Sequence, residues 1–411
     1  MGSTSPLPLW AGRSLALVGI LLVALNLRTA VAAISPITGH IGEDIALSSV
    51  GLGVLGALPP IAFAVSGFVA PVIAKRIGLE LAITLATVAM VAGDLARAFA
   101  GSFVQLMLGS VLALAGMGFG NILLPPAVKR YFPDRIGLVT TAYVTLLSIS
   151  TAVPAILAAP VADAAGWRVS LGVWSVLAFS SLVPWFFLLL NNRKKRLAAD
   201  PLGNDAVDEP EAALFRRMLR SRTAWAIALA MAVSSLNAYA TFAWFPELLT
   251  DIAGVDRIGA GALLAIYGIM GLPTGLLVPV LAARMRNVGL LVQLGVLFFV
   301  SAYLGLLFIP TYATWLWVVL AGLGPILFPV CLVLINLRTR SHHTSIALSG
   351  FVQSIGYTVG ATGPFIVGIL HDVTTGWTVP LIFLLGTALV AAISGFMLVK
   401  PRFVEDELRA A

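Results

Sequence analysis

The sequence predicts an all-α membrane protein of twelve transmembrane helices, arranged as two six-helix bundles. Three observations lead to this fold class: twelve long apolar stretches, a basic charge pattern that alternates from loop to loop, and an internal repeat of about 210 residues. The mean hydropathy is +1.01 and only 10% of the 411 residues are charged. Little of the chain is therefore left for a water-soluble domain.

Each apolar stretch is long enough to cross a bilayer, which takes roughly 20 residues of helix. Strands of a membrane barrel would be shorter and would alternate apolar with polar residues, so helices are the consistent choice. The twelve expected spans are residues 14–37, 48–74, 79–99, 103–125, 136–160, 169–190, 222–249, 258–283, 288–309, 311–335, 344–370 and 378–399.

The basic residues predict the orientation of these spans. If the amino terminus is cytoplasmic, 21 of the 25 lysines and arginines lie on the cytoplasmic side, three lie outside, and one, Arg28, lies within a span. This distribution follows the positive-inside rule and predicts a multi-pass protein of the cell (cytoplasmic) membrane with both termini in the cytoplasm. The net charge of +7 then reflects contact with anionic membrane lipid and does not imply nucleic-acid binding. The first apolar segment is too long for a cleaved signal peptide, so we expect it to remain.

The two halves of the chain resemble each other. Sliding one over the other by about 210 residues places Trp167 on Trp377, each preceded by glycine, and Asn26 on Asn237. Parallel repeats of six spans, with the substrate held between the halves, build one class of secondary transporter. The expected domains are an amino-terminal bundle at 1–190, a cytoplasmic linker at 191–221 and a carboxy-terminal bundle at 222–411.

Enzymes, receptors and channels fit the sequence poorly. A membrane enzyme needs a metal cluster or an activated nucleophile with its base, yet the chain has four histidines, one cysteine and no glycine-rich phosphate loop. Twelve repeated spans with short outer loops match neither a receptor nor a charged pore. We therefore expect no catalytic residues, no metal ligands and no cofactor. The predicted class is a monomeric carrier of a small-molecule substrate.

Three segments carry a family resemblance: "ALNLRTAVAAISP" in the first span, "YATFAWFPELL" ending the seventh, and "LSGFVQSIGYTVGATGPFIVGILHD" through the eleventh. With them the chain resembles the major facilitator superfamily and, more narrowly, its cyanate and 2-nitroimidazole transporter family. The resemblance covers essentially the whole chain and implies a permease that works by alternating access. The fifth span lacks the glycine-proline motif frequent in antiporters of the superfamily. We therefore favour a small polar or anionic organic solute, with drug or toxic-compound efflux as the alternative.

Arg28 is the leading candidate for a substrate-binding residue. Near the middle of a bilayer an arginine costs about 2.5 to 3.5 kcal/mol unless it is compensated. A guanidinium offers a rigid fork of donors that suits an anionic or strongly dipolar substrate. The structural alternative is a buried ion pair with Asp94 or Glu247, or bonds to helix carbonyls. Asp94 already has Arg97 three residues on as a partner.

Polar and aromatic side chains of other spans are expected around Arg28 in a mostly apolar pocket. Asn26 and Arg28 point in different directions on a regular helix, so both can face one cavity only if the helix unwinds locally. The other expected binding residues are Asn26, Tyr239, Trp244, Gln353 and Tyr357, with Asn121, Tyr143, Asn237 and Tyr267 as secondary candidates.

Coupling to protons would need a titrating group within the membrane. The chain offers few, and Asp94, Glu247 and His371 all lie toward the outer ends of their spans. Their structural interpretation is as interfacial or capping groups. We expect a cavity without an acidic proton carrier, with proton symport as the alternative if one of these three titrates.

Overall fold

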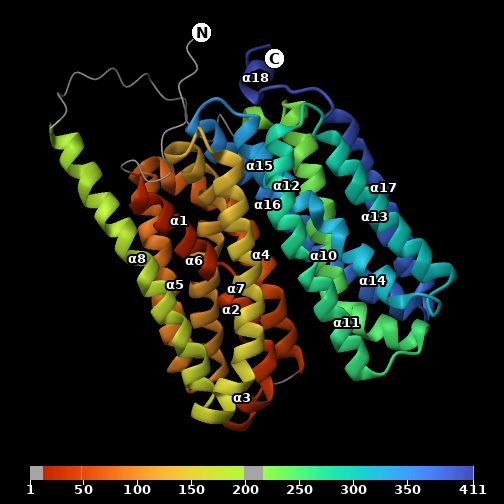
Figure 1. Cartoon of the computed structure of the whole chain (residues 1–411). Coiled ribbons are helices and arrows are strands. Elements are labelled where there is room, and N and C mark those ends of the chain that lie inside the picture. The colour runs from red at the N-terminus through yellow and green to blue at the C-terminus, as the bar shows by residue number, and fades with distance from the viewer. Residues whose placement is uncertain (1–12, 48, 199–215, 411) are drawn as a thin grey trace. The chain divides into compact units, whose positions relative to one another are not determined.

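The computed structural model describes residues 13–47, 49–198 and 216–410, and every regular element within them is a helix. The described part of the chain forms two units, shown in Figure 1. The first unit contains Met1–Arg216 and Ser341–Gly350, and the second contains Arg217–Arg340 and Phe351–Ala411. Most of the expected linker at 191–221 lies outside the described residues, which leave out 199–215.

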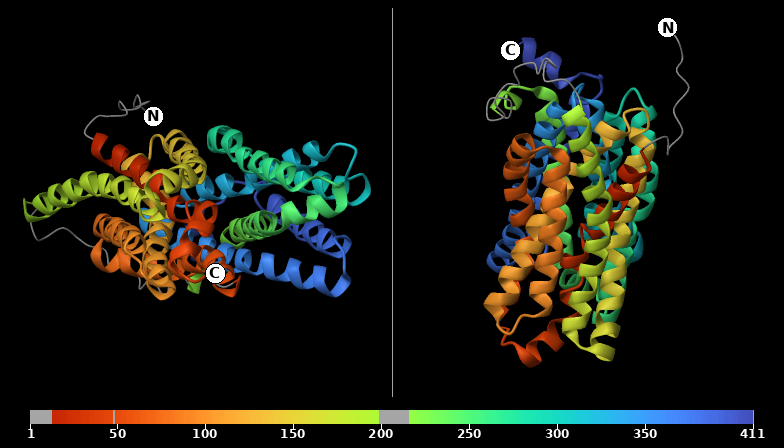
Figure 2. Two further views of the ribbon diagram at one scale, coloured as in Figure 1. Left: turned by 90° about the horizontal axis from the view of Figure 1, so that it is seen from below. Right: turned by 90° about the vertical axis from the view of Figure 1, so that its left-hand side faces the viewer.

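The first unit is a bundle of long helices that run along a common direction, as Figure 2 shows. Its first expected span is divided into several short helices, whereas the other five are continuous. The elements are α1 (Ser14–Asn26), α2 (Thr29–Ala32), η1 (Ser35–Ile37), α3 (Thr38–Asp44), α4 (Ser49–Ile77), α5 (Leu79–Ala98), α6 (Phe103–Tyr131), α7 (Ile136–Ala165) and α8 (Trp167–Ala198).

The second unit is also a helical bundle, and two of its expected spans are interrupted. A short carboxy-terminal helix follows the last span. The elements are α10 (Arg222–Ala253), α11 (Arg257–Ile269), α12 (Gly271–Arg284), α13 (Gly289–Phe308), α14 (Thr314–Leu323), η2 (Gly324–Ile326), α15 (Leu327–Leu337), α16 (His342–Thr374), whose first turns group with the first unit, α17 (Thr378–Met397) and α18 (Val404–Ala410).

Eleven helical segments of the described chain are long and apolar enough to cross a membrane. The expected eleventh span, α16, is as long as the others, but its glycines and polar residues lower its mean hydropathy. The first expected span, 14–37, is not one regular helix. The helix ends at Asn26 because Leu27 and Arg28 leave the regular helical path, and Arg28 has φ −129° and ψ −3°. Hydropathy reports the length of an apolar stretch but not its backbone angles.

The internal repeat is visible in matched hydrogen bonds of two asparagines. In α1 the Asn26 amide donates to the carbonyl four residues earlier at 2.8 Å and to Leu177 of α8 at 3.3 Å. In α10 the Asn237 amide donates to the carbonyl four residues earlier at 2.9 Å and to the Thr387 hydroxyl of α17 at 3.0 Å. Each asparagine thus ties the first helix of its half to the sixth.

Two tryptophans repeat in the same way. The indole N–H of Trp167, at the start of α8, donates to Asp44 at 2.9 Å, and that of Trp377, before α17, donates to Asp251 at 2.8 Å. Each aspartate lies in the helix or turn that ends the first span of its half. The sixth helix of each bundle is therefore anchored to the same place, as the repeat in the sequence predicts.

Candidate substrate-binding site

The helix break at Arg28 is the central feature of the first unit. Leu27 closes α1 with a bond from its N–H to the Ala24 carbonyl at 3.3 Å, and Arg28 precedes α2 as its N-cap residue. The Thr29 hydroxyl donates to the Asn26 carbonyl at 3.0 Å and so satisfies one acceptor that the break removes from the helix. The break supplies the local unwinding that the sequence analysis required for Asn26 and Arg28 to point independently.

The Arg28 guanidinium lies over the ring of Phe63 in α4, with 5.0 Å between its central carbon and the ring centroid. Phe63 is only 1% exposed, whereas Arg28 is half-buried. A cation over an aromatic face gains about 0.5 to 2 kcal/mol, depending on how far it is desolvated. This gain offsets part of the cost of holding an arginine in the membrane. The ring also fixes the plane from which the guanidinium can be approached.

Asp94 does not serve as the counter-ion of Arg28 but pairs with Arg97 on its own helix, as expected. The Arg97 Nη1 to Asp94 Oδ1 distance is 3.3 Å, and both side chains are 1% exposed. Arg97 Nη2 donates to the Ala30 carbonyl in α2 at 3.0 Å. The charge pattern of the sequence places Arg97 in an outer loop, as one of the three basic residues expected outside. The structure instead buries it at the end of α5, where it supports the segment just after Arg28.

Asn26 and Asn237 are both fully buried, and their amide N–H groups bond within their own halves. The side-chain oxygen Oδ1 of Asn237 also accepts a hydrogen bond from the Tyr303 hydroxyl at 2.7 Å. Of the neighbours Asn26 and Arg28, the asparagine therefore has the more evident structural role. Their roles in binding substrate stay predictions.

The candidates in the second unit come from the packed faces of α10 and α16. Gln353 and Tyr357 are buried one turn apart on α16. Tyr239 of α10 lies against α16, since a Cβ built at Gly360 would be 3.2 Å from its ring. Trp244 donates its indole N–H to the Pro364 carbonyl at 2.8 Å. Glycines of α16 make this close approach possible.

Three secondary candidates are buried side chains, two in the first unit and one in the second. Asn121 of α6 and Tyr143 of α7 are buried in the first unit, at 5% and 2% exposure. Tyr267 of α11 is buried in the second unit and meets the rings of Phe242 and Phe245 edge-on, at centroid distances of 5.2 and 5.8 Å. These aromatic contacts describe packing, and a role in substrate binding stays a prediction.

The remaining titratable candidates differ in their surroundings. Glu247 is exposed near the carboxy-terminal end of α10. His371 is partly buried between two indoles, with ring-centroid distances of 6.4 Å to Trp244 and 4.2 Å to Trp377, and its Nδ1 lies 3.6 Å from Asp372. Among the residues the structure describes, no group of three or more His, Cys, Asp or Glu is arranged to hold a metal ion.

The sequence matches the Major Facilitator Superfamily over residues 17–361. It is 30% identical over 390 residues to the 2-nitroimidazole transporter of Escherichia coli (strain K12), covering 93% of this chain and 95% of the relative. It is 21% identical over 363 residues to the cyanate transport protein CynX of the same organism, covering 86% and 89%.

The fold also matches solved structures. The proton:xylose symporter XylE, solved with 6-bromo-6-deoxy-D-glucose bound, superposes with a TM-score of 0.72 over 97% of this chain and 98% of that chain, at 15% identity. At that identity the likeness shows the shared fold. The chain therefore belongs to the Major Facilitator Superfamily, in the group that includes the 2-nitroimidazole and cyanate transporters, and is a multi-pass membrane transporter of small solutes.

Proposed function

We propose that the protein carries a small organic anion or a strongly dipolar organic solute by alternating access, and that Arg28 is the principal ligand of that solute. The position of Arg28 carries this proposal: it is a half-buried cation at a break in a membrane span, seated on Phe63. Asp94, the carboxylate considered as its counter-ion, is bound to Arg97. The relatives named for 2-nitroimidazole and cyanate transport support solutes of this size and polarity.

The polar and aromatic residues expected around the solute act as secondary ligands in this proposal. Gln353 and Tyr357 supply an amide and a phenol on one face of α16, and Tyr239 and Trp244 supply aromatic surface on α10. Orientation by a few convergent polar groups in an otherwise apolar pocket is the usual arrangement of a small-molecule site.

Uptake into proteoliposomes tests the role of Arg28. The solutes are labelled cyanate and labelled 2-nitroimidazole, and the variants are Arg28→Ala and Arg28→Lys. Arg286→Gln, at an exposed arginine in the loop between α12 and α13, is the control for a charge outside the spans. A hydrogen bond to a charged group contributes about 1.5 to 3 kcal/mol. Arg28→Ala should therefore weaken apparent affinity about 10- to 150-fold. Arg28→Lys should recover part of the loss, because it keeps the charge but not the fork. Equal uptake by Arg28→Ala and wild type, at equal reconstitution, would remove Arg28 from the site.

The direction of transport distinguishes uptake of a small solute from efflux of a toxic compound. We propose uptake of a small solute into the cell; efflux of a toxic compound uses the same fold. Cells that express the protein should accumulate the labelled solute faster than cells that carry the empty vector. Lower accumulation, together with greater resistance to 2-nitroimidazole, would establish efflux instead.

We propose that transport does not require a proton carrier, because Asp94 is held by Arg97 and Glu247 is exposed at a helix end. Uptake should then be the same with and without an imposed pH gradient. If uptake follows the gradient, Asp94→Asn, Glu247→Gln and His371→Gln identify the coupling residue as the variant that abolishes the dependence.

We propose that both termini face the cytoplasm and that the carrier acts as a monomer. The native cysteine, Cys331, is buried, so a Cys331→Ser protein gives a background for labelling. In intact cells an impermeant maleimide should label a cysteine placed at Gly101, in the loop before α6, and should not label one at Arg409. Reversed labelling would invert the topology.

A further inference from the structure

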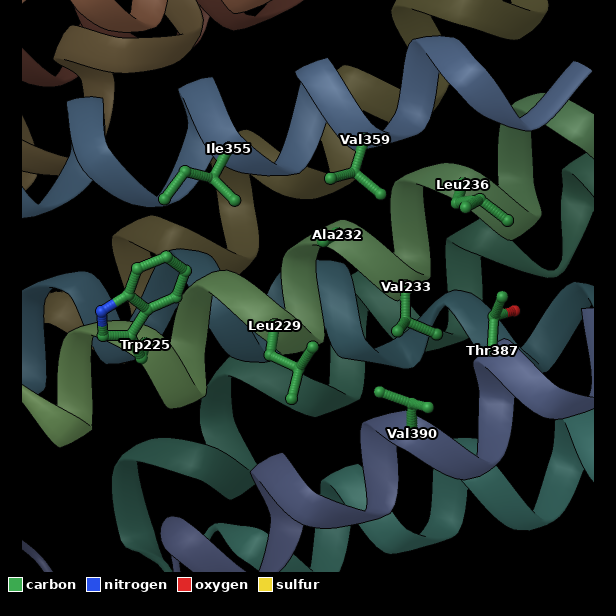
Figure 3. A pocket seen from close by; sticks show the side chains of 9 residues that line it. All are labelled: Trp225, Leu229, Ala232, Val233, Leu236, Ile355, Val359, Thr387 and Val390. Atoms are coloured by element: carbon green, nitrogen blue, oxygen red, sulfur yellow. The ribbon is translucent and has the colours of Figure 1, made fainter. Parts of the chain in front are cut away.

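The second unit contains an apolar cavity of about 290 Å³ whose lining includes none of the candidate substrate-binding residues. Figure 3 shows side chains of three helices around it: Trp225, Leu229 and Val233 of α10, Ile355 and Val359 of α16, and Val390 of α17. We call this cavity the α10–α16–α17 groove.

The wall of the groove is suited to hydrocarbon. Its polar lining residue, Thr387, donates its hydroxyl to the Leu384 carbonyl at 2.7 Å and accepts the Asn237 amide at 3.0 Å. Trp225 and Val390 are 42% and 44% exposed, so the groove opens at the surface of the spans. In a membrane that surface meets lipid, and the chemically matched occupant is an acyl chain.

The length of the groove matches one leaflet of the bilayer. Its lining residues on α10 run from Trp225, near the helix start, to Leu236. Eleven residues of helix at 1.5 Å each span about 16 Å. Half of a hydrocarbon core of about 30 Å is about 15 Å. The lining of the groove along α10 is therefore about as long as the hydrocarbon of one leaflet, which is the reach of a single acyl chain.

Two exposed basic residues lie where α10 begins and where α17 ends. Arg222 is exposed and precedes Trp225 by three residues, so both lie on the same face of α10. The Trp225 indole N–H donates to the Leu219 carbonyl at 2.9 Å, which fixes the ring at the interface where tryptophan is favoured. Lys400, just beyond the end of α17, is also exposed.

One carboxylate, Glu407, lies at the start of α10 and is bonded there to neutral donors. Glu407 of α18 accepts the Thr223 N–H at 3.0 Å and the hydroxyls of Thr223 and Ser221 at 2.8 and 2.7 Å. It therefore caps the start of α10. We propose that the α10–α16–α17 groove binds one acyl chain of an anionic phospholipid, whose phosphate is held by Arg222 and Lys400.

Quenching by brominated lipids tests this site in the full-length protein. The signal is the part of the tryptophan emission that disappears in Trp225→Phe. The protein is placed in phosphatidylcholine membranes that contain a low, equal fraction of either chain-brominated phosphatidylglycerol or chain-brominated phosphatidylcholine. The anionic lipid should quench the Trp225 emission several-fold more effectively. Equal quenching by the two lipids would mean ordinary boundary lipid and would overturn the proposal.

Two variants, each with a control, test the headgroup contact and the acyl-chain contact separately. One basic residue near an anionic surface contributes about 1 kcal/mol, so Arg222→Gln should reduce the preference for the anionic lipid about fivefold. Arg284→Gln, an exposed arginine at the end of α12, should leave it unchanged. Val390→Phe narrows the groove and should reduce quenching by both lipids, whereas Leu297→Phe on the exposed face of α13 should not. If Arg222→Gln behaves like Arg284→Gln, or Val390→Phe like Leu297→Phe, the site is refuted.

Discussion

The buried Asp94–Arg97 pair gives a prediction whose size can be worked from the structure. Both side chains are 1% exposed, so each charge depends on the other for compensation. Removing one partner of a buried pair typically destabilises a protein by about 3 to 5 kcal/mol. Arg97→Met should lose this amount, because it leaves the Asp94 carboxylate buried alone and also removes the donor to the Ala30 carbonyl.

The double variant distinguishes the pair from simple packing. With Asp94→Leu and Arg97→Met together, neither charge of this buried pair is left. Replacement of a whole buried pair by apolar residues often changes the free energy of unfolding little. The remaining loss is then the unpaired Ala30 carbonyl, about 1 to 3 kcal/mol. The double variant should therefore be more stable than Arg97→Met alone.

Reversible denaturant unfolding in mixed micelles, followed by tryptophan fluorescence, measures these free energies. The wild type, both single variants and the double variant complete a thermodynamic cycle. If the loss in the double variant equals the sum of the two single losses, the two side chains are not coupled. In that case the account of their burial given above fails.

Three further variants have defined outcomes in the same unfolding assay. Tyr303→Phe leaves the buried side-chain oxygen Oδ1 of Asn237 without its donor and should lower the free energy of unfolding by about 1 to 3 kcal/mol. Gly93→Ala places a Cβ 2.3 Å from a backbone nitrogen of α6 and should cost about 1 to 3 kcal/mol by overpacking. The Arg13 guanidinium, bonded at 2.6 Å, holds the pKa of Asp134 below its ordinary value. Asp134→Asn should therefore destabilise the protein above about pH 4 but lose its effect as the pH falls through the lowered pKa of the folded state.

Matched substitutions control for these effects. Tyr312→Phe, at a ring that is 85% exposed, should leave stability unchanged. Gly261→Ala adds a Cβ that meets no atom within 4 Å, so its helix should be unaffected or gain about 0.5 to 1 kcal/mol. A Gly93→Ala loss no larger than that of Gly261→Ala would contradict the packing argument. For Asp134→Asn, a difference from wild type that persists at low pH would contradict the ion-pair argument.

Much of the fold follows from the sequence because membrane insertion and the internal repeat leave few alternatives. The spacing of Gly109, Gly116 and Gly120 in the sequence predicts one face of α6 that another helix can approach closely. Cβ atoms at these positions would meet Arg97, Met90 and Leu27. The breaks in the spans were not predicted, since an apolar window has the same composition whether its helix is continuous or divided.

The candidate site was predicted less completely. The sequence singled out Arg28 because a charge within an apolar segment stands out. The burial of Arg97 was not predicted, because Arg97 lies at the end of a span, where an arginine normally reaches the interface. The signal that could have identified it is Gly109, where a Cβ would lie 2.9 Å from the Arg97 backbone nitrogen. A close helix contact at the level of an arginine leaves that side chain little access to water.

The differences between the two halves explain why Arg28 and the buried Asp94–Arg97 pair have no charged equivalents in the second half. Asn26 and Asn237 make equivalent bonds, and two residues beyond them stand Arg28 and Tyr239. The helix breaks at Arg28, whereas α10 continues through Tyr239.

The buried hydrogen-bond donors near these two helices also differ between the halves. At the repeat distance from Arg97 the second half has Leu307, which cannot donate to a freed carbonyl as Arg97 does to Ala30. At the repeat distance from Tyr303 the first half has Gly93, and within the described residues the side-chain oxygen Oδ1 of Asn26 has no hydrogen-bond partner. A broken first helix therefore requires a buried donor such as Arg97, and Arg97 in turn requires Asp94. The second half has neither, because its first helix is not broken at the position that corresponds to Arg28.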